Sequence, residues 1–297
     1  MTKNKTMTVI AYVVLAIFSI MAILPLLLLF IASFTDNATA IANGYSYFPA
    51  KWSVEAYKYI VDEWQLVGKG YGNTILITGI GTALSLIITS MLAYGLTVRD
   101  LPLKKIVMTM VIISMLFNGG IVATYFVYTN LFHIKDSYFA LLIPGYLMNG
   151  FNIILVMNYF RNSISEELLE AARIDGASEF RVFWKILLPL SVPVLATVGI
   201  NTAIAYWNDW TNGLYYLTAK NGQAYYTIQL ILQQINNDVN FLATNAAQMG
   251  ITVDTSSIPS TTVRMAIAAV GVLPLLIAYP FFQKYFVKGI SLGGVKG

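Results

Sequence analysis

The chain has 297 residues, of which 57% are hydrophobic and only 11% are charged, whereas a soluble domain carries about 25% charged residues. Together with a mean hydropathy of +0.67, this composition indicates an integral membrane protein. The small net charge of +4 gives no reason to expect a nucleic-acid partner, and the absence of cysteine excludes disulfides, thiolate metal sites and cysteine catalysis.

Six apolar runs predict an all-α integral membrane fold in a single domain, residues 1–297. About 20 residues per run suit a hydrocarbon layer of about 30 Å. The predicted spans are 9–34, 73–97, 106–128, 138–160, 190–210 and 262–286. Asn118-Gly119-Gly120 interrupts the third span, and the fourth contains Pro144 and Gly145.

The distribution of positive charge predicts the orientation. If the N-terminus is inside, about two thirds of the Lys and Arg residues fall in inside segments. Since cytoplasmic segments are enriched in Lys and Arg, we expect both termini and the segment 161–189 to be cytoplasmic. The segment 211–261 then forms a long outer loop.

The polar segment 161–189 has the pattern of two short helices joined by a turn. Ser165 and Ser178 are candidate N-caps, and Gly176 is a candidate stop for the first helix, because glycine adopts a left-handed conformation without steric cost. An apolar face is predicted for the second helix from spacing i, i+3, i+4 and i+7, at Phe180, Phe183, Trp184 and Leu187. Such a face must pack against this chain or a partner.

The predicted spans contain almost no ionisable residue, and a charge at the bilayer centre costs roughly 2.5–3.5 kcal/mol. This argues against an ion-coupled carrier and against an intramembrane protease. The sequence also lacks the G-x-x-x-x-G-K-[ST] phosphate-binding motif. Energy for uphill transport would therefore enter through a partner, and the segment 161–189 is the only sizeable cytoplasmic surface to receive it.

One motif in this segment is specific. Glu170-Ala171-Ala172, three residues, Gly176, nine residues, Ile186, one residue and Leu188-Pro189 resemble the EAA loop of permease subunits of bacterial ABC importers. The fuller match, EAARIDGAS followed by F and I-x-LP, resembles the carbohydrate-uptake branch, the maltose-type permeases. The resemblance implies the type I ABC importer permease fold.

In that family the EAA loop docks on an ATPase subunit. Carried over residue by residue, the resemblance implies an ATPase-coupling role for Glu170, Ala171, Ala172, Asp175, Gly176, Phe180 and Phe183. The aromatic residues either fill a groove of the partner or pack the loop against helix ends of this chain; both readings stay open.

Uncharged polar residues on the helices beside this loop are candidates for a sugar pathway, because sugars bind through amide and carboxylate hydrogen bonds and aromatic stacking. The candidates are Asn149, Asn152, Asn201, Tyr206 and Asp209. The alternative is interhelical hydrogen bonding without a ligand.

The resemblance further implies a non-catalytic subunit of the bacterial cytoplasmic (inner) membrane that moves a sugar, expected to be an oligosaccharide. The implied partners are a second homologous permease, two ATPase subunits, an extracellular solute-binding (lipo)protein and the lipid bilayer. This chain is expected to hold no cofactor and no metal, since ATP and Mg²⁺ belong to the ATPase subunits. The loop 211–261 resembles the loop that enters the solute-binding protein in the maltose system, or it folds as a cap.

Two alternatives remain from the sequence. The same kind of importer would serve another solute, such as a polyol, a sugar acid or a glycerophosphodiester; Asp209 and the lack of an intramembrane Arg or Lys favour a neutral cargo. A secondary carrier would need no ATPase, but the missing ionisable residues count against it.

Overall fold

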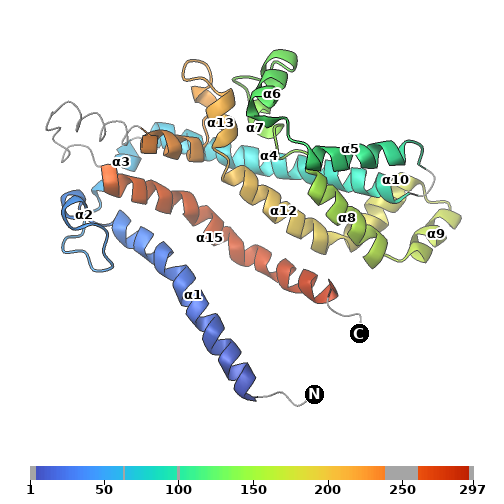
Figure 1. The fold of residues 1–297 in the computed structure, drawn as a ribbon, viewed down its shortest axis with the longest axis horizontal. Helices are drawn as coiled ribbons and strands as arrows, with labels where there is room; N and C mark the ends of the chain where they lie inside the picture. The colour runs from blue at the N-terminus through green and yellow to red at the C-terminus, as the bar shows by residue number, and fades with distance from the viewer. Residues whose placement is uncertain (1–4, 63, 99–100, 238–259, 294–297) are drawn as a thin grey trace. The chain divides into compact units, whose positions relative to one another are not determined.

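The structure, a computed structural model, describes four ranges of the chain: 5–62, 64–98, 101–237 and 260–293. Within these ranges every regular element is helical, so the predicted all-α fold is confirmed (Figure 1). Contacts divide the chain into two compact units. The first comprises Met1–Gly68 and Ile231–Pro274, and the second comprises Lys69–Leu230 and Leu275–Gly297.

The first unit holds a long apolar helix followed by two short ones. Its elements are α1 (Lys5–Ser33), α2 (Asn37–Asn43), α3 (Glu55–Asp62) and the first part of α15 (Ser260–Gly293). The ring of Tyr57 on α3 stacks on Phe34 at 4.6 Å between centroids. The side chains of α1 from position 9 to position 27 are exposed, which leaves an apolar surface for lipid or for another protein.

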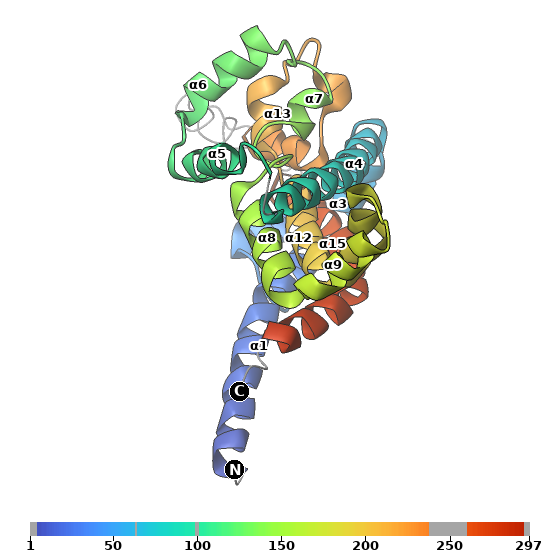
Figure 2. The ribbon, with the colours of Figure 1, turned by 90° about the vertical axis from the view of Figure 1, so that its right-hand side faces the viewer.

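The second unit is built around α4, one uninterrupted helix of 34 residues (Figure 1; Figure 2). The elements from α4 to the end of this unit's first segment are α4 (Trp64–Thr97), α5 (Lys104–Leu116), α6 (Gly120–Phe126), a π-helical turn (Val127–Leu131), α7 (Phe139–Leu142), α8 (Gly150–Ser163), α9 (Glu166–Ile174), α10 (Glu179–Val182), a second π-helical turn (Phe183–Leu187), α11 (Leu188–Leu190), α12 (Val192–Trp207), α13 (Thr211–Tyr216) and a 3₁₀ turn (Gln223–Tyr225). Residues 228–237 are also helical; of these, 228–230 belong to the second unit and 231–237 to the first.

Three helices among the described residues are long and apolar enough to cross a membrane. They are Met7–Ser33 of α1, Trp64–Thr97 of α4 and Thr261–Pro280 of α15. They overlap the predicted first, second and sixth spans, although α4 begins at Trp64, before the second predicted span. The predicted fifth span corresponds to α12, which meets the preceding helical stretch Glu179–Leu190 at a bend of 79°.

The predicted third and fourth spans are not single helices. The helix α5 ends at Leu116, and Asn118 turns its side-chain oxygen onto the Gly120 N–H at 2.9 Å to begin α6, so the predicted interruption is confirmed. In the fourth span Pro144 and Gly145 separate α7 from α8. The φ of +82° at Gly145 is a conformation that cannot continue a helix.

The apolar core of the second unit surrounds the Tyr94 end of α4. Buried side chains from α8, such as Val156 and Phe160, pack with Val182 and Leu187 of the polar segment. The loop that is predicted to be cytoplasmic is therefore anchored in a hydrophobic core, and only part of its surface is free for a partner.

Candidate functional site

The helix caps predicted in the segment 161–189 are present. The Ser165 hydroxyl accepts the Leu168 N–H at 3.4 Å to begin α9, and the Ser178 hydroxyl accepts the Arg181 N–H at 3.4 Å to begin α10. The Ser165 hydroxyl also donates to the Glu167 carboxylate, which lowers the pKa of Glu167. Local sequence signals therefore suffice to fix where these helices begin.

The turn between the two helices is made by Gly176, as predicted. Its φ is +82°, a left-handed conformation that disfavours any side chain. The Gly176 N–H donates to the Arg173 carbonyl and the Ala177 N–H donates to the Ala172 carbonyl, each at 3.0 Å. These bonds satisfy carbonyls at the end of α9 that lack helical partners.

The predicted single apolar face is wrong. Phe180 and Trp184 are exposed, by 69% and 42%, whereas Phe183 and Leu187 are buried. Side chains four positions apart share one side of a helix, so Phe180 and Trp184 lie together on the outer side, and Phe183 and Leu187 lie together on the core side. The ring of Phe183 packs against Tyr94 at 5.5 Å between centroids.

Among the predicted coupling residues, the structure therefore separates those on the surface from those inside. Glu170, Ala171, Asp175, Gly176 and Phe180 are exposed, and Ala172 is half-buried against the core. Phe183 is buried, so it supports the loop from within instead of presenting a surface. Ile174, which the sequence pattern did not single out, is 86% exposed.

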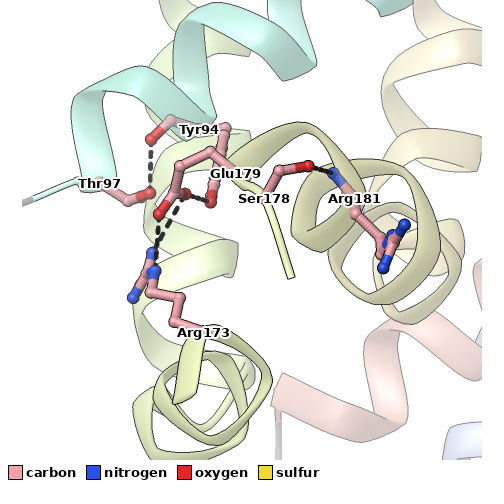
Figure 3. A network of polar contacts seen from close by, with 6 residues as sticks. All are labelled: Tyr94, Thr97, Arg173, Ser178, Glu179 and Arg181. Carbon is pink, nitrogen blue, oxygen red and sulfur yellow. Dashed lines mark hydrogen bonds and ion pairs between the residues drawn. The ribbon is translucent and has the colours of Figure 1, made fainter. Parts of the chain in front are cut away.

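A charged network joins the two helices of the loop to α4 (Figure 3). The Arg173 guanidinium donates to both carboxylate oxygens of Glu179, from Nε at 2.7 Å and from a terminal nitrogen at 3.3 Å. The Tyr94 hydroxyl donates to the same carboxylate. The Glu179 carboxylate raises the pKa of Arg173. No sequence signal pointed to Tyr94, which lies 85 positions from Glu179.

Two further cationic side chains donate hydrogen bonds to main-chain carbonyls at the C-terminal end of α4. Arg161 donates to the Leu96 carbonyl and Lys104 donates to the Val98 carbonyl, each at 2.8 Å. Carbonyls at a helix C-terminus have no partner within the helix and carry partial negative charge. Both cations therefore fix the position of α4 relative to α8 and α5.

A pocket of about 750 Å³ opens between α9 and the ends of α4 and α8. Its ionisable lining residues are Lys104, Arg161, Arg173, Glu166, Glu170 and Glu179. Three of these residues are basic and three are acidic, so their charges give the pocket no net preference for an anionic or a cationic ligand. The part of the chain that the structure describes holds no cluster of His, Asp and Glu residues suited to a metal ion.

The candidates for a sugar pathway divide into capping or buried residues and accessible ones. The Asn149 side chain accepts the Asn152 N–H at 3.1 Å and caps α8. Tyr206 is buried and donates to the Leu142 carbonyl at 2.7 Å. Asp209 is buried and accepts the N–H groups of Thr211 and Asn212, at 3.0 and 3.1 Å, to begin α13. These three side chains have structural partners.

Asn152 and Asn201 remain accessible. Asn201 is exposed on α12, and Asn152 is half-buried on α8. Among the candidates for a sugar pathway, these two amide side chains are the ones that the described contacts leave accessible to a ligand.

Comparison with known proteins agrees with this architecture. Residues 85–292 match the family described as binding-protein-dependent transport system inner membrane component. The chain is 36% identical, over 99% of its length and 100% of the relative, to the polygalacturonan/rhamnogalacturonan transport system permease protein YtcP of Bacillus subtilis (strain 168). It is 38% identical to Protein LplC of the same organism, over 93% of this chain and 90% of that protein.

A solved structure is also similar. A chain from the crystal structure of a bacterial ABC transporter involved in the import of the acidic polysaccharide alginate superposes with a TM-score of 0.78 at 29% identity, covering 96% of this chain and 98% of that one. The chain therefore belongs to the family of binding-protein-dependent transport system inner membrane components, the permease subunits of ABC importers.

Proposed function

We propose that this chain forms half of the translocation pathway of an ATP-driven oligosaccharide importer and couples to an ATPase subunit through the segment 161–189. The observation that carries this proposal is the exposed surface of α9 and α10, where Ile174 and Phe180 project from a loop that is otherwise anchored in the core. Large exposed apolar side chains on a polar loop need a partner to cover them.

The coupling residues follow from that surface. Glu170, Ala171, Asp175 and Phe180 would contact the ATPase directly, with Gly176 setting the turn between α9 and α10. Ala172 and Phe183 would hold the loop against the core. In this proposal the chain itself is non-catalytic, and ATP and Mg²⁺ are bound by the partner ATPase subunits.

The remaining partners would be a second homologous permease, two ATPase subunits and an external solute-binding (lipo)protein. The exposed apolar length of α1 supplies surface for the second permease or for lipid. The chain would lie in the bacterial cytoplasmic membrane with both termini inside. Closure of the ATPase subunits would draw the two permease loops together and turn the cavity outward, and hydrolysis of ATP would reset it.

The proposed cargo is an oligosaccharide. Asn152 and Asn201 are the amide side chains that we assign to the pathway. The transport system of YtcP and the alginate transporter are both named for polysaccharides. Asp209 does not support a neutral cargo, because its side chain is buried and accepts the Thr211 N–H at the start of α13. An acidic oligosaccharide is the second candidate, favoured by the acidic polysaccharide of the alginate transporter.

Co-purification tests the coupling surface. The tagged chain, gently solubilised from its native membrane, is expected to bring an ATPase and a second permease with it. Phe180→Ala should weaken ATPase binding by more than about tenfold and so reduce the recovered ATPase, because a buried aromatic anchor contributes about 2 kcal/mol or more at an interface. Phe48→Ala is the matched control, because Phe48 is a 91% exposed phenylalanine of the first unit. Recovery of the chain alone would contradict the proposed function.

A competition panel tests the cargo. The complex in proteoliposomes, with its solute-binding protein, would be given a labelled neutral or acidic oligosaccharide together with unlabelled competitors. Competition by oligosaccharides, and not by polyols or glycerophosphodiesters, is expected. Competition by polyols or glycerophosphodiesters, and not by oligosaccharides, would contradict the proposed cargo and would leave the proposed coupling surface standing.

A further inference from the structure

The helix α4 carries hydrogen bonds to other parts of the second unit near both of its ends. Asn73 and Tyr94 are 21 positions apart on this uninterrupted helix, which corresponds to about 32 Å at 1.5 Å per residue. The sequence of α4 contains no proline, the residue that most often kinks a helix. It is therefore suited to transmit displacement along its axis.

The Asn73 end is bonded to the segment that follows α13. The Asn73 amide donates to the carbonyls of Ala224 and Tyr226, each at 2.9 Å, and its oxygen accepts the Tyr138 hydroxyl at 2.9 Å. Both amide hydrogens and one lone pair of the oxygen are therefore used, and Asn73 is 8% exposed.

A second bond lies one residue further along. The Thr74 hydroxyl accepts the Ile228 N–H at 2.9 Å, and both residues are buried. Residues 224–228 are thus attached to α4 through main-chain groups. A rearrangement of this segment would have to move the Asn73 end of α4 or break these buried bonds.

Between its ends α4 is packed closely on α12. A Cβ placed on Gly81 would lie 2.6 Å from the ring of Tyr206, and one on Gly199 would lie 3.1 Å from Leu86. These glycines let the two helices approach closely, so α4 and α12 form a packed pair.

The Tyr94 end has two described hydrogen bonds to the segment 161–189, here called the coupling loop. The Arg161 side chain donates to the Leu96 carbonyl, and the Tyr94 hydroxyl donates to Glu179, which Arg173 also holds. Tyr94 packs its ring on Phe183, so the ring and the hydroxyl have separate contacts. Replacing Tyr94 by Phe removes the hydrogen bond while it keeps the ring.

We propose that Tyr94 is a positioning residue for coupling: its hydroxyl, through Glu179 and Arg173, holds α9 and α10 at a fixed angle to α4. Movement at residues 224–228 then reaches the ATPase-facing loop through α4, and movement of the loop reaches residues 224–228 in return. This inference rests on the proposed function, because it assigns a role within the importer.

The test measures the coupling ratio, the number of cargo molecules taken up per ATP hydrolysed by the complex in proteoliposomes with its solute-binding protein. A purely structural defect lowers uptake and hydrolysis in proportion and leaves this ratio unchanged. Tyr94→Phe and Glu179→Gln are each expected to lower the ratio about threefold to tenfold, the range for losing a hydrogen bond to a partly exposed charged group.

A matched control exists on the same helix. Thr97→Val removes a hydroxyl from α4 whose described hydrogen bond goes to the Tyr94 carbonyl of the same helix. This variant should keep the coupling ratio of the unsubstituted complex.

A second measurement needs only this chain. Because the sequence has no cysteine, spin labels can be placed at Met91→Cys on α4 and Leu168→Cys on α9, both exposed positions. Tyr94→Phe should broaden the distance distribution between the labels. Thr97→Val should leave it narrow.

The outcomes separate the two proposals. Absence of ATP hydrolysis stimulated by the solute-binding protein in the unsubstituted complex would refute the proposed function, and the label distances would still decide whether Tyr94 positions the loop. A working importer in which Tyr94→Phe and Glu179→Gln keep both the ratio and the narrow distances would overturn the inference alone.

Discussion

The two ends of α4 are held by chemically different bonds. At the Asn73 end the partners are neutral, mostly main-chain groups, and the side chains of Asn73 and Thr74 are buried. At the Tyr94 end the partners are charged and accessible, since the side chains of Arg173 and Glu179 are 34% and 55% exposed. Buried hydrogen bonds are costly to break, whereas an exposed ion pair contributes little to stability.

This difference suggests different uses. The Asn73 end is suited to stay intact while the protein works. The Tyr94 end adds little to stability, so its accessible charged groups are suited to set the angle of the loop beside the ATPase. Substitutions along α4 should therefore affect stability at one end and coupling at the other.

The largest expected effect is on stability at the Asn73 end. Asn73→Leu leaves the Ala224 and Tyr226 carbonyls and the Tyr138 hydroxyl without this partner. We expect a loss of about 3 kcal/mol in the free energy of unfolding, measured by thermal unfolding of the detergent-solubilised chain.

The control for this experiment is Asn158→Leu, an exposed asparagine of α8, which should change the unfolding temperature little. Equal unfolding temperatures for the two variants would show that the buried bonds of Asn73 do not stabilise the fold.

A smaller effect is expected where α4 meets α12. Gly81→Ala places a methyl group against the buried Tyr206 ring, and overpacking of this kind costs about 1–3 kcal/mol. A Cβ on Gly79, two residues away, meets nothing within 4 Å, so Gly79→Ala should be neutral or stabilising by about 0.5–1 kcal/mol because alanine favours the helix. Thermal unfolding of the two variants, measured in parallel, tests whether Gly81→Ala lowers the unfolding temperature while Gly79→Ala does not. Identical shifts in unfolding temperature would contradict the close packing at Gly81.

The smallest effect on stability is expected at the Tyr94 end. Glu179→Gln removes an exposed ion pair with Arg173, so the free energy of unfolding should fall by less than about 1 kcal/mol. The difference should shrink further at high salt, because screening weakens exposed charges. Unfolding scans at low and high salt test this, and a loss as large as that of Asn73→Leu would remove the contrast between the two ends.

Sequence reasoning succeeded where the signal is local. The caps at Ser165 and Ser178, the stop at Gly176 and the break at Asn118 are decided by a few neighbouring residues, and the structure confirms each. Asn149 and Asp209 carried the same kind of signal, since each lies just before a helix. Their capping roles could have been predicted in place of a sugar pathway.

The remaining features depend on contacts between distant positions. Tyr94 and Glu179 are 85 positions apart, and Asn73 and Tyr226 are 153 apart. Periodicity and capping rules apply within a few turns of one helix, so they predict neither of these long-range hydrogen bonds. The burial of Phe183 was missed for another reason: positions i, i+3, i+4 and i+7 cover a wide arc of a helix, and the spacing alone does not show which part of that arc faces the core.

The π-helical turn also bears on how the length of this segment can vary. A single π-helical turn inside an α-helix takes up one extra residue, and here that turn is Phe183–Leu187. Deleting one residue within the turn would give ordinary α-helical bonding and is expected to leave Phe180 on its present surface. Deleting Arg181 or Val182, where the bonding is already α-helical, would instead change the direction of Phe180 relative to the helix that follows by about 100°.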